Sequence, residues 1–314
     1  MSRNHDWLLD SDPAIRWQVL RDLEGAPADV VAAERAKVAS EGWGAQLLAL
    51  QREDGTWEGG ALFPANFKFN REEGQPWTAT EPTLTLLRLF GADPNDQRVR
   101  QAVERAGENA RWEHAGQRFF DGEVEPCING KALALGAYFG QNVDGIVDRF
   151  MREQLEDGGW NCEAENGSVR SSFDTTINVL EGLLEHEQAT GGSADSRAAR
   201  RRGNEYLLER NLFRRKSTGE VIKPDYLQLA FPSRWHYDIL RALDYFRAAG
   251  DPPDPRMDEA VQVLRSKHQP DGTWPLENTY RGKVHFELEE AGKPSRWNTL
   301  RAQRVLDWYG RTND

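Results

Sequence analysis

Apolar residues recur along the chain at helical spacing, in two kinds of segment. The first kind is densely apolar and begins with Pro, Ser or Thr, which are residues that start helices. One example runs from Pro232 to Phe246, and a similar segment begins at Pro294. The dense pattern predicts helices that are buried on much of their circumference. The expected ranges are 13–24, 78–90, 129–140, 173–189, 235–248 and 297–309.

The second kind of segment is amphipathic and more polar, and it alternates with the first. The expected helices are 28–50, 96–112, 143–156, 195–211 and 257–268. Three of them end in a similar turn: Gln51-Arg-Glu-Asp-Gly-Thr-Trp57, Gln154-Leu-Glu-Asp-Gly-Gly-Trp160 and the shortened Gln269-Pro-Asp-Gly-Thr-Trp274. Gly in this position can take the left-handed conformation that ends a helix. The Trp can then fold back as an apolar plug, while the Gln binds exposed backbone.

Six dense helices that alternate with outer ones predict an all-α fold, an (α/α)6 barrel that forms a single domain over residues 1–314. A closed ring buries every interface between repeats, so it needs no capping repeat at either end. Strand signals are weak throughout. The segments 113–126, 213–232 and 275–293 are long for helix connections, and long connections in compact folds often carry function.

Composition and charge exclude several classes of protein. The chain has 314 residues, of which 38% are hydrophobic, and its formal net charge is −11. We therefore expect no nucleic-acid partner, because an acidic chain repels phosphate. No apolar stretch approaches the roughly 18–20 residues that span a bilayer, and no secretory signal is expected at the N-terminus. Two cysteines are too few for a disulfide framework, so the expected location is cytoplasmic. The oligomeric state is left open.

The Gln-x-x-x-Gly-x-Trp turn resembles the QW repeat of squalene and oxidosqualene cyclases. These enzymes share an α/α-toroid with the β-subunits of protein prenyltransferases. The resemblance covers nearly all of the chain, and it implies a single-toroid member that binds a prenyl-like or other small organic substrate in the barrel cavity. The segment from Arg202 to Leu207 also matches the front half of the repeat, without its Trp.

The family's catalytic motifs are matched only in part. The Asp-x-Asp-Asp motif with which hopene-type cyclases protonate their substrate is absent, as are the magnesium motifs of ionising terpene synthases, so conventional squalene cyclisation is not expected. Protein prenyltransferases bind zinc through Asp-x-Cys at one inner-helix start and a His at the next. Asp174 and His236 match this arrangement in type and separation, but Thr176 stands at the cysteine position. This departure argues against protein prenylation.

The two cysteines of the chain offer other thiolate ligands. Cys127, Cys162 and His236 lie near the starts of three successive dense helices, which a ring of parallel inner helices places side by side on one rim. We therefore predict that they bind Zn²⁺, with Asp174 or solvent as the fourth ligand. Lanthionine-forming cyclases, another toroid group, similarly use two Cys and one His. The alternatives are a purely structural metal, or no metal and cysteines that pack as small hydrophobic residues.

Asp174, Asp121 and Tyr237 are the candidate catalytic residues. Asp121 belongs to an acidic loop that enters the same rim, and Tyr237 is expected one turn into an inner helix. A solvated loop and a core tyrosine are the alternatives. Arg234 and Arg296, which occupy matched Pro-Ser-Arg-Trp turns, either bind an anionic substrate or brace the fold.

The favoured function is a zinc-assisted, transferase- or cyclase-like enzyme. One alternative is a non-catalytic toroid that binds a ligand or a protein. The other is a carbohydrate-active (α/α)6 hydrolase or lyase, which as a glycosidase would need two carboxylates about 5–10 Å apart.

Overall fold

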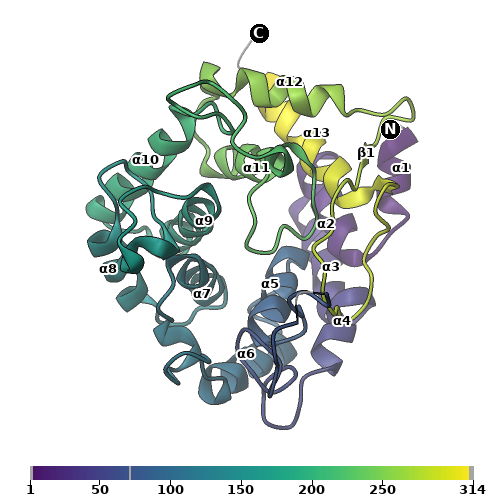
Figure 1. Cartoon of the computed structure of the whole chain (residues 1–314). Helices are drawn as coiled ribbons and strands as arrows, with labels where there is room; N and C mark the ends of the chain where they lie inside the picture. Colours follow the sequence, from purple (N-terminus) through teal and green to yellow (C-terminus); the bar gives the residue numbers. More distant parts are fainter. Residues whose placement is uncertain (1–2, 71, 311–314) are drawn as a thin grey trace.

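The computed structural model describes residues 3–70 and 72–310, which form an all-α toroid with an inner and an outer layer of helices (Figure 1). The inner helices are α2 (Pro13–Asp22), α5 (Thr80–Phe90), α7 (Pro126–Tyr138), α9 (Phe173–Thr190), α11 (Ile239–Ala249) and α13 (Arg296–Gly310). The remaining α-helices are α1 (Arg3–Leu9), α3 (Ala28–Ala36), α4 (Gly42–Ala49), α6 (Gln97–Asn109), α8 (Asp144–Glu153), α10 (Ala194–Leu208) and α12 (Asp258–Ser266). Each densely apolar segment coincides with an inner helix, so the predicted fold class is confirmed. No helix in the described ranges is long and apolar enough to cross a membrane.

Short elements occupy several of the connections. The 3-10 helices are η1 (Lys37–Ala39), η2 (Phe119–Asp121), η3 (Cys162–Asn166), η4 (Pro224–Leu227) and η5 (Pro255–Met257). The strands β1 (Trp274–Pro275) and β2 (Pro294–Ser295) pair antiparallel, with Trp274 opposite Ser295. This pair holds together the two ends of the long connection between α12 and α13.

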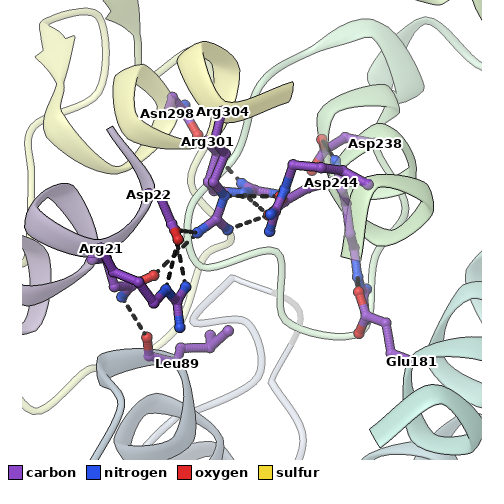
Figure 2. Close-up of polar contacts among 12 residues, drawn as sticks. Arg21, Asp22, Leu89, Glu181, Asp238, Asp244, Asn298, Arg301 and Arg304 are labelled. Carbon is purple, nitrogen blue, oxygen red and sulfur yellow. Dashed lines mark hydrogen bonds and ion pairs between the residues drawn. The ribbon is translucent and has the colours of Figure 1, made fainter. Parts of the chain in front are cut away.

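The inner helices form a closed ring. Each packs against its neighbours in the order α2, α5, α7, α9, α11 and α13, and α13 packs against α2. Polar contacts strengthen both junctions of α13, as Figure 2 shows: Arg304 forms an ion pair with Asp244 of α11 and another with Asp22 of α2, the latter at 3.3 Å. Arg304 also donates to the side chain of Gln18 at 3.2 Å. The first and last inner helices are therefore joined directly.

The tryptophans of the three repeated turns have the same surroundings. Trp57, Trp160 and Trp274 are 0%, 0% and 3% exposed. Each indole N–H donates to the carbonyl oxygen ten residues earlier, in the preceding outer helix: Leu47 at 2.8 Å, Phe150 at 3.0 Å and Leu264 at 2.8 Å. Each backbone N–H donates to a threonine hydroxyl of the next inner helix: Thr80 at 3.2 Å, Thr176 at 3.1 Å and Thr299 at 3.0 Å. The tryptophans thus join the outer layer to the inner one.

The glutamines of these turns are equivalent in only two copies. The side chain of Gln154 donates to the carbonyl oxygens of Gly158 (2.6 Å) and Ala199 (2.8 Å), and Gln51 makes the corresponding pair of bonds. Gln269 donates instead to the carbonyl of Lys267. In this third copy Asn4 of α1 donates to the turn glycine, Gly272, at 2.6 Å. The first helix of the chain therefore takes the place of the missing glutamine contact.

Two departures from the predicted helices have a clear local cause. The range 28–50 is not one helix, because η1 and the left-handed Gly42 (φ 61°) separate α3 from α4. Helix α11 begins at Ile239 rather than 235, because the Asp238 carboxylate caps it by accepting the Arg241 N–H at 2.8 Å. His236 and Tyr237 consequently lie in the segment before the helix.

Candidate functional site

Two adjoining cavities lie inside the ring. The rim cavity, of about 390 Å³, is lined by the first turns of α5, α7 and α9 and by the segment before α11. The axial cavity, of about 220 Å³, is lined by later turns of the inner helices. Thr85, Lys131 and Arg234 line both cavities, so they mark the boundary between them.

The two cysteines meet in the wall of the rim cavity. Cys127 lies in the first turn of α7 and Cys162 begins η3, and their Sγ atoms are 2.9 Å apart. A carboxylate oxygen of Glu125 lies 3.4 Å from Cys127 Sγ, and the Thr175 hydroxyl lies 3.5 Å from Cys162 Sγ. The candidate ligand atoms of Glu125, Cys127 and Cys162 lie within 4.8 Å of one another. Neighbouring inner-helix starts thus bring together two thiols that are 35 residues apart in sequence.

The contact between the thiols separates their pKa values. The contact with the Cys127 thiol, together with the Thr175 hydroxyl, lowers the pKa of Cys162. The same contact, together with burial, raises the pKa of Cys127. Cys162 is therefore the first of the two to ionise, and a thiolate is the form that binds metals and attacks electrophiles.

His236, the third predicted ligand, lies apart from the cluster of Glu125 and the cysteines. Its ring is stacked between Trp235, with centroids 3.6 Å apart, and Tyr280, with centroids 3.8 Å apart and an interplanar angle of 8°. Among the described residues it does not belong to the group of close ligand atoms around the cysteines. Burial lowers the pKa of His236 to about 4, so the stacked ring is neutral at physiological pH.

Asp174 lines the rim cavity but uses its carboxylate on the neighbouring chain segments. It accepts hydrogen bonds from the Tyr237 backbone N–H (2.8 Å) and the Tyr226 hydroxyl (3.0 Å), and it pairs with Lys223 at 3.1 Å. These contacts hold the segment before α11 against the start of α9.

The other two candidate catalytic residues do not line the cavities described here. Asp121 is exposed at the end of η2. Tyr237 is 1% exposed, packs edge-on against Phe173, and donates its hydroxyl to the Leu212 carbonyl at 2.5 Å. Burial raises the pKa of Tyr237 well above its usual value. The structure places Asp121 on the surface and Tyr237 in the core.

A buried ion pair that sequence reasoning missed lies at the boundary between the cavities. Lys131 Nζ is 3.3 Å from a carboxylate oxygen of Glu81, which also accepts the Thr85 hydroxyl at 2.7 Å. Burial lowers the pKa of Lys131. A charged residue inside a densely apolar segment was the available signal, since such a residue cannot face the hydrophobic core without a partner.

The axial cavity is rich in positive charge although the chain as a whole is acidic. Among its lining residues, seven are basic and three are acidic: Arg88, Lys131, Arg234, Arg241, Arg247, Arg301 and Arg304 against Glu181, Glu185 and Asp244. Most of these groups are paired. Arg241 binds Glu181 through two nitrogens, at 2.8 and 2.6 Å, and Arg88 lies 2.6 Å from Glu185. The cavity wall nevertheless carries more positive than negative charge.

The fold and this site define an α-helical toroid with a thiol-lined internal cavity. No protein-family model matches the chain, and no curated protein matches it. A solved structure of a protein from Actinoplanes is similar, with a TM-score of 0.45 and 15% identity over 96% of this chain and 90% of that one. The type II terpene cyclase MstE from Scytonema, in its apo form, is also similar, with a TM-score of 0.44 and 17% identity over 94% and 86%. These similarities are too distant to assign an activity.

Proposed function

We propose that the chain is a zinc-dependent enzyme that acts on a small, partly apolar organic substrate in the rim cavity. In this proposal Glu125, Cys127 and Cys162 hold the metal. The observation that carries it is the convergence of two thiols and a carboxylate in the wall of a cavity of about 390 Å³. Small-molecule sites are typically cavities of this size with a few convergent polar groups.

The donor set fits zinc better than the hard divalent cations, because thiolates select Zn²⁺ while Mg²⁺ and Ca²⁺ prefer oxygen. Zn–S bonds of about 2.3 Å in a tetrahedral site separate two sulfurs by about 3.8 Å. The observed Sγ–Sγ distance of 2.9 Å therefore requires the thiols to move apart by about 1 Å on binding. Three protein ligands leave a fourth position for solvent or substrate, as catalytic zinc sites do. When bound, the ion would lower the pKa of a coordinated water or thiol, or polarise a carbonyl.

The residues around the thiols supply the other functions that such an enzyme needs. Trp77, Trp235 and Ile128 form apolar wall for the substrate body, which agrees with the prenyl-like substrate that the sequence resemblance implies. Lys131, whose pKa is lowered by burial, is suited to transfer a proton with Glu81 as its partner. We infer that Asp174 positions the segment that carries Trp235.

The remaining predictions from the sequence stay predictions. Ligation by His236 would require its ring to leave the stack between Trp235 and Tyr280. Catalysis by Asp121 or Tyr237 forms no part of the proposal. A non-catalytic toroid with a structural metal and a carbohydrate-active enzyme remain the alternative functions.

The test of the metal site is zinc content after purification without a His tag and under reducing conditions. We expect about one zinc per chain in the wild type and a loss of at least about tenfold in Cys127→Ala and Cys162→Ala. Glu125→Gln should weaken zinc affinity about 10–100-fold, whereas Glu163→Gln, at an exposed acid beside Cys162, should not. A wild type that holds no zinc and gives two free thiols, or a Cys127–Cys162 disulfide, would contradict the proposal.

Cobalt substitution separates a catalytic from a structural site. Co²⁺ bound to thiolates absorbs visible light according to its coordination, and an open position lets an added small thiol change that spectrum. We expect a change on adding 2-mercaptoethanol. A spectrum that stays the same would indicate four protein ligands and favour the structural alternative.

A further inference from the structure

Arg234 lies at the junction of the internal cavities, and no carboxylate of the described residues forms an ion pair with it. Its side chain contributes to the rim cavity, the axial cavity and a third cavity under the connection between α12 and α13. Within the described ranges its guanidinium makes no hydrogen bond or ion pair, and it lies over the Trp77 ring at 5.0 Å from the centroid. Burial lowers the pKa of Arg234 to about 10, so the group remains charged at neutral pH.

An unpaired cation in this partly buried position is costly to the folded protein. Moving a charge from water into a protein interior is unfavourable unless a counter-charge or hydrogen-bond acceptors compensate it. Arg234 also has a backbone φ of 54°, a left-handed conformation that non-glycine residues rarely adopt. Both costs fall on one residue, and strained, unpaired groups of this kind are concentrated at ligand-binding sites.

The second Pro-Ser-Arg-Trp turn shows what this arginine does when it serves the fold. Arg296 also lies over a tryptophan, Trp7, at 4.6 Å. Its guanidinium donates to two backbone carbonyls, of Trp7 at 3.2 Å and Asp10 at 3.1 Å, and so fastens α13 to α1. Arg234 has the same sequence context and the same kind of aromatic neighbour, but its N–H groups have no protein acceptor in the described chain. Arg296 therefore braces the fold, whereas the guanidinium of Arg234 is available to a ligand.

Charge around Arg234 favours an anion over a neutral ligand. Lys131 lines the same two cavities, and in the described ranges its one ion pair is with Glu81, at 3.3 Å. Glu81 and Glu287 act on Arg234 through space without forming an ion pair with it. The axial cavity beyond this boundary has more basic than acidic lining residues. On the opposite side, the rim cavity offers the apolar surfaces of Trp77 and Trp235.

We propose that Arg234 binds the anionic head group, a carboxylate or a phosphate monoester, of a substrate whose apolar body lies in the rim cavity. The guanidinium offers several N–H donors in a fork that matches either group. With its head at the boundary between the cavities, the substrate would lie along the wall that carries Cys127 and Cys162. The inference rests on the proposed function only in taking the rim cavity as the substrate site, and it does not depend on the metal.

The test compares three eight-carbon probes by calorimetry: octyl phosphate, octanoate and neutral octanol. We expect at least one anionic probe to bind the wild type about 10–100-fold more tightly than it binds Arg234→Met, because a charge-assisted hydrogen-bond pair is lost. Octanol should bind both proteins equally, and Arg234→Lys should recover part of the affinity. The more affected anion identifies the head group. Arg296→Met, the matched control, should bind the anions as the wild type does.

Several results would overturn the inference. They are an absence of binding by both anions, equal binding of octanol and the anions to the wild type, and a loss in Arg234→Met that octanol shares. An equal loss in Arg296→Met would assign the effect to the fold and also overturn it. Repeating the titrations with Cys127→Ala separates this inference from the metal site. Arg234-dependent binding that survives in a zinc-free variant supports the anion site even if the zinc proposal fails.

Discussion

Trp160 and Trp235 differ in what their indole rings contact. Trp160 is 0% exposed, and its N–H is satisfied by the Phe150 carbonyl. Trp235 is 38% exposed, lines the rim cavity and stacks on His236. The first holds two helix layers together, and the second is available to a ligand. Substitution of Trp160 should therefore change stability, and substitution of Trp235 should change ligand binding.

Trp160→Ala should lower the free energy of unfolding by about 3–5 kcal/mol, because it leaves a large cavity between the layers. Trp235→Ala, the comparison variant, should change that free energy by less than about 1 kcal/mol. Urea unfolding followed by far-ultraviolet circular dichroism measures both. Equal stability of Trp160→Ala and the wild type would show that the indole is not a structural plug.

Single residues of the site were predictable where ring geometry alone placed them. Cys127 and Cys162 could be paired from the sequence because adjacent inner-helix starts must lie side by side. His236 could not be placed in this way, since its ring direction depends on Trp235 and Tyr280. Tyr280 belongs to a long connection without periodicity. Within the described ranges Arg234 forms no ion pair, and this depends on where the neighbouring carboxylates point. No sequence pattern predicts those directions.

At the scale of an element, the repeated turn offers an internal comparison. Gln154 bridges the carbonyls of Gly158 and Ala199, and so ties the end of α8 to α10. Within the described ranges, the side chain of Gln269 donates only to the Lys267 carbonyl, at 3.2 Å, and does not reach a second helix. Glutamine is therefore expected to contribute more to stability in the Gln154 copy of the turn than in the Gln269 copy.

Gln154→Ala should cost about 1–3 kcal/mol in the free energy of unfolding, because two carbonyls lose their donor. Gln269→Ala should cost less than about 0.5 kcal/mol. Chemical denaturation of the two variants in parallel gives the comparison. Similar losses in both would mean that the contact to the neighbouring helix contributes little.

Elements as a whole were predicted better than their ends. The six inner helices follow from apolar periodicity, because a buried helix must be apolar wherever its neighbours cover it. Ends depend on single side chains and on backbone conformation. The Asp238 cap and the left-handed Gly42 each moved a boundary by several residues.

At the scale of the whole molecule, buried charges join three inner helices. Asp244 of α11 accepts contacts from Arg247 of its own helix and from Arg301 and Arg304 of α13, and Arg304 continues to Asp22 of α2 (Figure 2). These arginines hold the pKa of Asp244 well below its usual value of 3.8. The network therefore stabilises the closed ring through an ionised carboxylate.

Asp244→Asn should lower the free energy of unfolding at pH 7 by about 3–5 kcal/mol, because buried arginines lose their counter-charge. The contribution of Asp244 is fully present above the pKa of the unfolded state and is lost as pH falls through the lower folded pKa. The stability difference between wild type and variant should thus shrink below about pH 4. Urea titrations between pH 7 and pH 2 measure it, with Asp148→Asn, at an exposed position, as control. A difference that is constant with pH would contradict this role.

The junction of α2 and α13 also has a consequence for biosynthesis. Arg304 and Asp22 are 282 residues apart, so the surface of α2 that faces α13 has no partner until the residues between them have been translated. At about 5–20 residues per second, that interval is roughly 15–55 s. During this time the nascent chain exposes the edge of an open arc. The axial cavity, whose wall includes Arg301 and Arg304 of α13, cannot be complete before this helix has emerged.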